Sequence, residues 1–248
     1  MGGIRLLSVV MPAHDEESCL APAVREVADG LRSRGVEFEL LVVENGSTDH
    51  TVAIADELAA DIPEVRTFSL AEADYGLALK RGFRAASGDL VAIFDVDYYD
   101  LEFLDGALTA IDRADGADGA DAPAIVVASK RGAGSVDSRA LSRQIVTSGF
   151  SLILRAGFGL QVTDTHGMKL LRRAPLADLA ESCRFGTDLF DTELIIRAQR
   201  AGMKVVEIPV NVRETRPSRS SIARRIPRTV AGLFRLRLAL WQERFGAP

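Results

Sequence analysis

Two aspartates spaced two residues apart, Asp95 and Asp97, are the side chains of this sequence that most directly suggest chemistry. They follow the apolar run at 90–94, which is typical of a buried strand. Open α/β sheets bind ligands beyond the carboxyl ends of their strands. Two carboxylates at such an end can share a divalent cation such as Mg²⁺, which prefers oxygen ligands and keeps positions open for substrate phosphates. The pair therefore predicts a metal clamp for a diphosphate, although Asp residues after strands also serve in turns and helix caps, as we expect for Asp100.

The elements that must position this pair alternate between strands and helices. Short apolar runs ending at turn residues predict strands at 6–11, 38–43, 65–70, 90–94, 125–129 and 205–212, and a strand at 163–171 that crosses over the site. Amphipathic patterns predict helices at 24–35, 52–58, 76–86, 101–114, 139–158, 189–201 and 227–245. The segment Ser47-Thr48-Asp49 supplies N-cap chemistry for the second helix, with Ser47 or Thr48 expected as the cap. Pro209 favours an edge or terminal position for the last strand. The alternation predicts an α/β fold with a single doubly wound, mostly parallel sheet flanked by helices.

Composition and charge narrow the function classes. The chain has 248 residues, 47% hydrophobic and 26% charged, which is ordinary for a soluble globular protein of one large or two small domains. Its net charge of -5 argues against a general nucleic-acid partner. From Arg213 onward, however, the sequence contains many arginines and only two acidic residues, Glu214 and Glu243. This asymmetry predicts an anionic partner, a phosphate or an acidic membrane surface, unless the later arginines form a solvated helix face.

The cysteines and the apolar runs bear on location. Cys19 and Cys183 fit neither a zinc nor a redox motif, so buried, reduced thiols in a cytosolic protein are the favoured interpretation. The first residues lack a signal-peptide pattern, and no apolar run has the length needed to cross a bilayer. We therefore expect a cytoplasmic protein, with any membrane contact peripheral at the inner face.

Six motifs occur in an order that resembles a known family. They are SVVMPAHDEE, VVENGSTDHT, YGLALKRGF, GDLVAIFDVD, DTHGMKLLRR and FDTELIIRAQRAGMKVVEIPV. Together, over residues 6–221, they resemble the family 2 glycosyltransferases of GT-A fold, and most closely the subgroup of dolichyl-phosphate mannose synthase-like (polyprenyl-phosphate glycosyltransferase-like) enzymes. The resemblance implies an inverting transfer of a sugar from a nucleotide-diphosphate donor with Mg²⁺ or Mn²⁺. It also implies a glycosyltransferase domain at 1–221, followed at 222–248 by a basic amphipathic helix packed on the domain or at a membrane surface.

The resemblance also implies a donor site. The first two strand ends would lie side by side and hold the base and ribose, with Glu44 one methylene longer than the usual Asp. Lys80 matches a basic position that assists departure of the diphosphate. Asp95 and Asp97 would hold the metal that binds this diphosphate. A GDP-mannose or a UDP-glucose type of donor is compatible with these residues. The implied donor-binding residues are Pro12, Ala13, His14, Glu16, Glu44, Asn45, Lys80 and Asp95.

The acceptor side leaves two alternatives. A lipid phosphate is already ionised and needs cations to hold it; the resembling positions are Ser129, Lys130, Arg131, Arg143, Arg216 and Ser220. A hydroxyl acceptor would need a general base. Asp188 and Asp191 are the candidates for that base, although Asp191 and Glu193 could instead balance charge at a helix N-terminus. Asp164 and His166 are expected to line the acceptor side.

These observations favour a metal-dependent glycosyltransferase that acts on a polyprenyl phosphate at the cytosolic membrane face. One alternative keeps the donor chemistry and uses a soluble hydroxyl acceptor, such as a natural-product or glycan intermediate. Another is a catalytically silent nucleotide-sugar-binding protein, which the intact Asp95 and Asp97 pair opposes. A Rossmann dehydrogenase is poorly supported, because PAHDEE and not a glycine-rich turn follows the first strand.

Overall fold

The protein is described by a computed structural model that covers residues 5–116, 122–129, 141–160, 162–163, 165, 167–186, 189–210 and 222–245. Side chains are described in these ranges except at 115–116, 141–148, 151, 222–228 and 244–245. The strands are β1 (Leu7–Ala13), β2 (Phe38–Asn45), β3 (Val65–Leu70), β4 (Leu90–Ile93), β5 (Ile125–Ser129), β6 (Lys169–Arg172) and β7 (Val205–Pro209). The helices are α1 (Leu20–Ser33), α2 (Thr51–Asp61), α3 (Tyr75–Ala85), α4 (Leu101–Gly116), α5 (Leu141–Phe158), α6 (Arg173–Ser182), α7 (Phe190–Arg200) and α8 (Ile222–Phe245).

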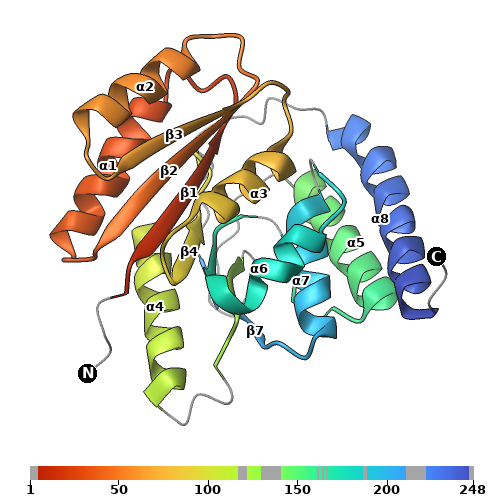
Figure 1. Cartoon of the computed structure of the whole chain (residues 1–248). Coiled ribbons are helices and arrows are strands. Elements are labelled where there is room, and N and C mark those ends of the chain that lie inside the picture. The colour runs from red at the N-terminus through yellow and green to blue at the C-terminus, as the bar shows by residue number, and fades with distance from the viewer. Residues whose placement is uncertain are drawn as a thin grey trace.

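The strands form one sheet in the order β3-β2-β1-β4-β6-β5-β7 (Figure 1). Strands β1 to β4 pair in parallel, as do β5 and β7, so the predicted mostly parallel sheet is confirmed. Every residue of β1, β2 and β4 is buried, because helices cover both faces of the sheet. Strand β7 is an edge strand, as predicted, and it ends at Pro209, earlier than the predicted strand at 205–212.

Strand β6 is the exception to the parallel pattern. It lies between β4 and β5 and runs antiparallel to both. The strand predicted at 163–171 was expected to cross over the site, and this expectation is wrong: its last part belongs to the sheet interior, where hydrogen bonding to two neighbours is available. Because of its direction, β6 places its first residue, Lys169, opposite Ile93 at the end of β4.

Two apolar clusters fill the two sides of the sheet. One joins the sheet to α1, α2 and α4, with Leu31, Leu58 and Leu104 among its fully buried members. The other joins it to α3, α6, α7 and α8, where Leu79, Leu176 and Leu194 are buried. In Figure 1, α5, α7 and α8 lie next to one another, on the other side of the molecule from α1 and α2.

Helix α8 packs onto this domain through one of its sides. Its residues Leu233, Leu236 and Leu240 are buried in the second cluster. At Gly232 an added Cβ would stand 2.3 Å from the Leu189 side chain, so the glycine permits the close approach of α8 to the start of α7. None of the described helices combines the length and the apolar content that crossing a membrane requires.

The amino ends of β1, β2 and β4 are joined by Glu39. Its carboxylate accepts hydrogen bonds from Ser8 Oγ at 2.6 Å, from the Ser87 backbone N–H at 2.6 Å and from Arg66 Nη1 at 2.8 Å. Ser8 Oγ in turn accepts from the Gly88 N–H at 2.9 Å. The buried Glu39 carboxylate is thereby satisfied by hydrogen bonds, at the end of the strands opposite to the Asp95 turn.

Candidate active site

The carboxyl ends of β1, β2 and β4 meet at one edge of the sheet, and Asp95 and Asp97 lie there. Beyond β4, the backbones of Asp95 and Tyr98 exchange hydrogen bonds of 3.2 and 3.1 Å, which form a tight turn. This turn leaves Asp95 partly buried and Asp97 exposed. Asp100 then caps α4, since its Oδ1 accepts from the Glu102 N–H at 2.8 Å, as predicted.

Asp95 lies in a charged environment that the sequence did not predict. The Tyr75 hydroxyl donates to Asp95 Oδ1 at 2.9 Å. Burial raises the pKa of Asp95 above its ordinary value, whereas the Tyr75 hydrogen bond and the Lys169 charge lower it. The negative charges of Asp191 and Asp97 raise it further. Burial, followed by the Asp95 charge, also raises the pKa of Tyr75 well above its usual value, so the phenol remains a proton donor at neutral pH.

A buried ion pair stands next to this aspartate. Lys169 Nζ lies 3.0 Å from Asp191 Oδ2 and donates to the Gly167 carbonyl at 2.6 Å. Asp191 is in the first turn of α7, and its side chain is 2% exposed, against 1% for Lys169. Neither Asp191 oxygen accepts a hydrogen bond from the described part of the chain. The pair therefore joins β6 and α7 beside Asp95 and leaves one buried carboxylate with unused acceptor capacity.

The charges around Asp95 fit a divalent cation. The negative charges of Asp97 and Asp191 act on Asp95, and Lys169 supplies the one positive charge among the described groups that act on it. The described residues give Asp97 no hydrogen-bond or ion-pair partner, so its oxygens are available as ligands. They contain no cluster of three or more His, Cys, Asp or Glu side chains arranged to hold a metal. Asp95 and Asp97 would thus hold Mg²⁺ or Mn²⁺ with substrate or water oxygens completing the shell.

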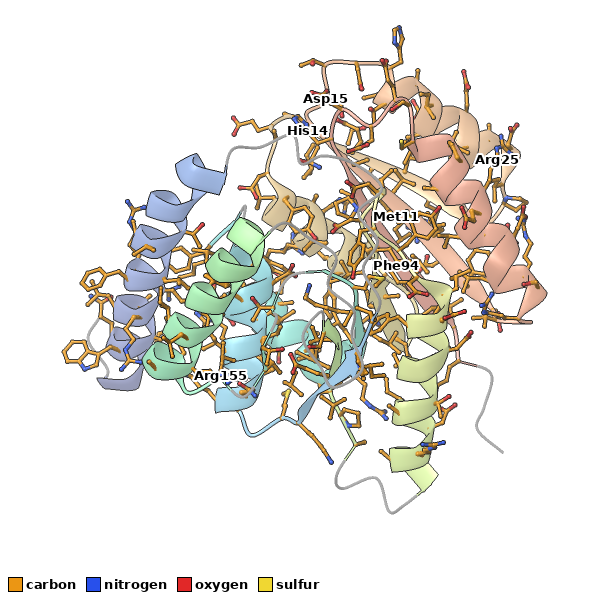
Figure 2. All side chains as sticks on the ribbon, turned by 180° about the vertical axis from the view of Figure 1, so that it is seen from behind. Met11, His14, Asp15, Arg25, Phe94 and Arg155 are labelled. Atoms are coloured by element: carbon orange, nitrogen blue, oxygen red, sulfur yellow. The ribbon has the colours of Figure 1, made fainter. Side chains whose placement is uncertain are left out.

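The loops after β1 and β2 brace each other. Asn45 Nδ2 donates to the Ala13 carbonyl at 2.8 Å, and His14 Nδ1 donates to the Asn45 carbonyl at 2.9 Å. Glu44 is buried and accepts from the Ser47 N–H. His14 is exposed at the end of β1 (Figure 2). Its ring therefore has a free face toward solvent, whereas Glu44 and Asn45 are already used within the loops; their roles in donor binding stay predictions.

The predicted cap of α2 by Ser47 or Thr48 is wrong. Both residues instead bind Asp15, whose φ of 53° is in the left-handed region. Ser47 Oγ accepts from the Asp15 N–H at 3.0 Å, and the Thr48 N–H donates to Asp15 Oδ1 at 2.7 Å. Asp49 takes over at the helix start and accepts from the Thr51 N–H at 2.9 Å. The loop after β1 is thus fixed to the loop after β2, with Pro12 buried inside β1.

Glu16 and Lys80, two further residues predicted to bind the donor, have structural roles in their own surroundings. Glu16 forms the turn into α1: its N–H donates to Thr51 Oγ1 at 2.8 Å, and its carbonyl accepts from Leu20. Lys80 Nζ donates to the carbonyls of Glu181 and Cys183 at 2.6 and 3.2 Å. Lys80 therefore ties α3 to the end of α6, and its expected contact with a diphosphate stays a prediction that would require this ammonium to change partners.

On the acceptor side, the structure describes few of the predicted residues. Ser129 is buried, and its Oγ lies 3.0 Å from Thr163 Oγ1, which donates to Glu207 at 2.8 Å. Glu193 is structural: it accepts from the backbone N–H groups of Arg184 and Phe185 at 2.9 Å and pairs with Arg197. The predictions that lie outside the described residues concern Lys130, Arg131, Asp164, His166, Asp188, Arg216 and Ser220, together with the side chain of Arg143.

Residues 8–180, more than half of the chain, match the family model described as "Glycosyl transferase family 2". The chain belongs to glycosyl transferase family 2. The family predicted from the six motifs is thereby confirmed, and Asp95 and Asp97 fall within the matched region.

Curated relatives of this family 2 member include longer proteins. Glycosyltransferase AglD of Haloferax volcanii is 31% identical over 210 residues, which cover 83% of this chain and 32% of AglD. Dolichyl-phosphate beta-glucosyltransferase ALG5C of Trichomonas vaginalis is 28% identical over 231 residues, covering 86% and 66%. The dolichyl-phosphate beta-glucosyltransferase of Saccharomyces cerevisiae is 24% identical, covering 88% and 70%. The chain thus spans about a third of AglD and just under two thirds of ALG5C.

Solved structures confirm the fold of this family 2 member. Mannosyl-3-phosphoglycerate synthase from Rubrobacter xylanophilus aligns with a TM-score of 0.69 and 18% identity, over 99% of this chain and 76% of its own. Glucosyl-3-phosphoglycerate synthase from Mycobacterium tuberculosis, solved with Mn²⁺, UDP and glucosyl-3-phosphoglycerate, aligns with a TM-score of 0.64 and 22% identity, over 98% and 81%. At these identities the likeness establishes the GT-A-like α/β fold.

Sequence reasoning missed two residues of the site. Tyr75 was not singled out, because a tyrosine at a helix start resembles any half-buried aromatic residue. Lys169 was quoted within a motif without a role, although a lysine inside the apolar segment GMKLL was a usable signal. A buried lysine needs a charged or polar partner, and the carboxylates of this family 2 site were the available ones.

Proposed function

We propose that this chain is an inverting glycosyltransferase that moves a sugar from a nucleotide-diphosphate donor to a polyprenyl phosphate at the cytosolic membrane face. One observation carries the proposal: Asp95 and Asp97 extend from the carboxyl edge of a family 2 fold into a site with excess negative charge. Such a site suits a donor that arrives with Mg²⁺ or Mn²⁺ on its diphosphate. The names of the T. vaginalis and yeast relatives support glucose as the sugar and a lipid phosphate as the acceptor.

The residues divide the work by position. Asp95 and Asp97 would hold the cation, which when bound neutralises charge that develops on the departing diphosphate. Tyr75 fixes one Asp95 oxygen and leaves the other free to bind. The exposed ring of His14, beside the braced loops of β1 and β2, is positioned to stack on a base. A phosphate acceptor is already ionised, so the transfer requires no proton acceptor from the protein.

The test is a donor screen by titration calorimetry in the presence of Mn²⁺, with UDP-glucose first and GDP-mannose as the alternative. Asp97→Ala is the informative variant, because Asp97 is exposed and its loss should not unfold the protein. Asp89→Ala is the matched control, since Asp89 is also exposed and stands at the opposite end of the same strand. We expect one donor to bind wild type and Asp89→Ala alike, and Asp97→Ala at least tenfold more weakly.

Two results would count against the proposal. Equal donor binding by Asp97→Ala would remove the aspartate pair from the metal site. Absence of binding for every nucleotide sugar would favour a silent binding protein or scaffold. If donor binding holds, transfer to a short-chain polyprenyl phosphate tests the acceptor.

A second candidate keeps the donor and replaces the lipid by a soluble hydroxyl acceptor. It is favoured by Asp191, a carboxylate beside Asp95 whose oxygens accept no hydrogen bond from the residues that the structure describes. The activity of an Asp191→Asn variant distinguishes a hydroxyl acceptor from a phosphate acceptor. A base would give a large loss of kcat with a changed pH profile, whereas transfer to an ionised phosphate would keep its pH profile.

A further inference from the structure

Helix α8 has a second apolar side that the domain does not cover. While Leu233, Leu236 and Leu240 pack inward, Val230, Phe234, Leu238 and Trp241 are 45%, 73%, 47% and 55% exposed. Their spacings of four, four and three residues place these four side chains along one stripe of the helix. We call this stripe the outer face of α8. An exposed apolar row of this length on a helix is typical of an interaction surface.

Helix α5 extends this surface. It lies beside α8 in both views of the molecule (Figures 1 and 2). Arg237 of α8 stands over the Phe158 ring of α5, 5.8 Å from its centroid. Two apolar residues of α5, Leu152 and Ile153, are 67% and 43% exposed. Apolar exposure is therefore concentrated on these two neighbouring helices.

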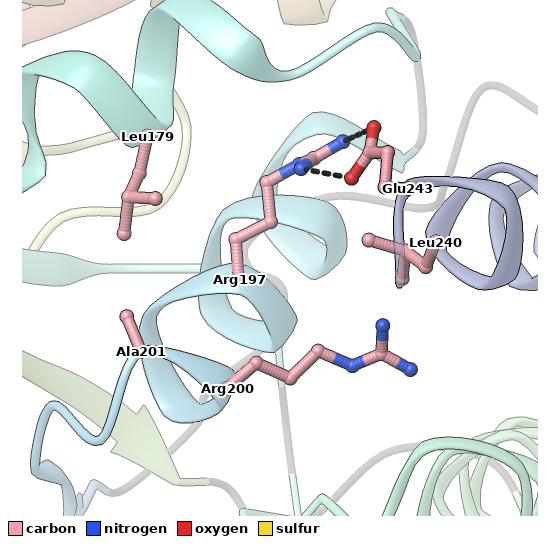
Figure 3. Close-up of a pocket in the computed structure, with 6 residues that line it drawn as sticks. All are labelled: Leu179, Arg197, Arg200, Ala201, Leu240 and Glu243. Carbon is pink, nitrogen blue, oxygen red and sulfur yellow. Dashed lines mark hydrogen bonds and ion pairs between the residues drawn. The ribbon is translucent and has the colours of Figure 1, made fainter. Parts of the chain in front are cut away.

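The charge of the two helices is opposite to that of the whole chain. The chain carries a net charge of -5. The sequence of α5 contains two arginines and no acidic residue, and α8 contains a single acidic residue, Glu243. Glu243 is directed inward and binds Arg197 at 2.9 and 3.1 Å (Figure 3). The arginines of α8 are Arg224, Arg225, Arg228, Arg235, Arg237 and Arg244.

We propose that the outer face of α8, with the neighbouring part of α5, docks in the plane of an anionic lipid bilayer. An exposed apolar stripe with Phe234 and Trp241, with the exposed Arg235 and Arg237 on the same helix, is the pattern of helices that lie in a membrane interface. Negatively charged headgroups attract the arginines, and the apolar side chains insert at the headgroup boundary. The inference deepens the proposed function, on which its membrane location rests, but its test requires no glycosyl transfer.

The packing of α8 would transmit this docking to the site. Gly232 lets α8 contact Leu189, two residues before Asp191, and the Glu243 to Arg197 pair fixes α8 to the last part of α7. Two anchor points on one helix set both position and direction. A membrane bound to the outer face would therefore hold α7, and with it the Asp191 and Asp95 edge, in a fixed orientation relative to the lipid surface.

The test uses the fluorescence of Trp241, the single tryptophan of the sequence. Vesicles of phosphatidylcholine alone and mixed with phosphatidylglycerol are added to the full chain, and binding is measured in parallel by flotation. We expect the Trp241 emission to shift to the blue with the anionic vesicles only, and added salt to weaken the binding. Phe234→Ser should lower vesicle affinity about tenfold or more, the amount expected for one large apolar side chain.

Leu77→Ser is the matched control, because Leu77 is 51% exposed on α3 and lies outside the two helices. It should bind vesicles like wild type. Three results would overturn the inference: no emission shift with any vesicle, flotation without a shift of Trp241, or equal binding by Phe234→Ser and wild type. A blue shift that grows with protein concentration in the absence of lipid would assign the face to a second copy of the chain instead.

The same variants distinguish a failure of the docking proposal from a failure of the proposed function. Phe234→Ser should retain wild-type affinity for the nucleotide sugar in calorimetry. Loss of vesicle binding with intact donor binding supports the docking face, whereas intact vesicle binding without any donor binding contradicts only the proposed reaction.

Discussion

Lys169 Nζ lies 3.0 Å from Asp191 Oδ2, and both side chains are almost completely buried. Burying a charge is costly unless a partner and hydrogen bonds compensate for the lost hydration. Lys169 has both, since it also donates to Gly167, whereas Asp191 depends on Lys169 alone among the described groups. The two residues are therefore energetically coupled, and removing one leaves the other as an unpaired buried charge.

We expect Lys169→Met to lower the free energy of unfolding by about 3–5 kcal/mol, the usual effect of removing one partner of a buried pair. The measurement is urea denaturation followed by circular dichroism. Lys204→Met, at an exposed position, is the control and should cost much less. The double variant Lys169→Met with Asp191→Asn should be more stable than Lys169→Met alone; a strictly additive result would show that the two side chains are not coupled.

Glu39 predicts how stability depends on pH. Burial by itself would raise the pKa of Glu39, but hydrogen bonds from Ser8, Ser87 and Arg66 outweigh it and hold the pKa below 4.5. A carboxylate with a lowered folded-state pKa stabilises the fold above its unfolded-state pKa and loses this contribution as the pH falls through the folded-state value. The stabilisation should therefore be complete at neutral pH and decline below about pH 4.5.

Glu39→Gln should cost about 1–3 kcal/mol at pH 7, because buried donors lose a charged acceptor. The difference from wild type should shrink as the pH is lowered through the acid range. Glu37→Gln, on the exposed residue two positions earlier, serves as the control in the same denaturation series. A wild-type to Glu39→Gln difference that stays constant from pH 7 to the acid limit would contradict this role.

The attachment of α8 gives a third prediction. Arg197 is mostly buried and divides its guanidinium between Glu193 and Glu243, of which only Glu243 belongs to α8. Glu243→Gln should weaken this contact by about 1–2 kcal/mol, reduced by the partial exposure of Glu243. Amide hydrogen exchange should accelerate in α8 while α7 remains protected. Glu181→Gln removes a more exposed ion pair, that with Arg84, and should leave exchange in α8 unchanged.

The two thiols should differ in reactivity. Burial raises the pKa of Cys183 to about 12, so its thiol is protonated at neutral pH and is shielded from reagents. The expectation of a buried thiol is confirmed for Cys183 and wrong for Cys19, which is only partly buried because it precedes the first turn of α1. Alkylation with iodoacetamide followed by mass spectrometry should modify Cys19 first, with Cys183 reacting only after denaturation. Rapid modification of native Cys183 would show that the loop after α6 opens.

Much of the fold could be predicted because apolar runs and amphipathic repeats depend on local sequence. The positions of β1 to β5, and the placement of Asp95 and Asp97 after β4, follow from this pattern. The direction of β6 does not, since a buried parallel strand and a buried antiparallel strand have the same apolar composition. Lys80 shows a further limit: its two hydrogen bonds to carbonyls at the end of α6 join residues about a hundred positions apart, which the local pattern does not reveal, and its expected contact with a phosphate stays a prediction.

Capping residues illustrate the same difference between local and tertiary information. Asp100 caps α4 as expected, because its partners are two and three residues away. Ser47 and Thr48 had the right chemistry to cap α2, yet both bind Asp15, which is more than thirty residues distant in sequence. Competition from a residue of another loop cannot be read from the local pattern.

Because β6 runs antiparallel to its neighbours, insertions near its two ends should affect different parts of the protein. The strand enters the sheet with Lys169 opposite Ile93, next to the aspartates, and leaves it with Arg172 opposite Leu90. Arg172 and Arg173 then bind the carbonyls of Pro123 and Gly88 at the far edge. An insertion before Lys169 would shift a charged residue of the site, whereas one at Arg172 or Arg173 would act first at the opposite end of the strand. Among family members that share this strand, we therefore expect the residues before Lys169 to differ in type more readily than in number.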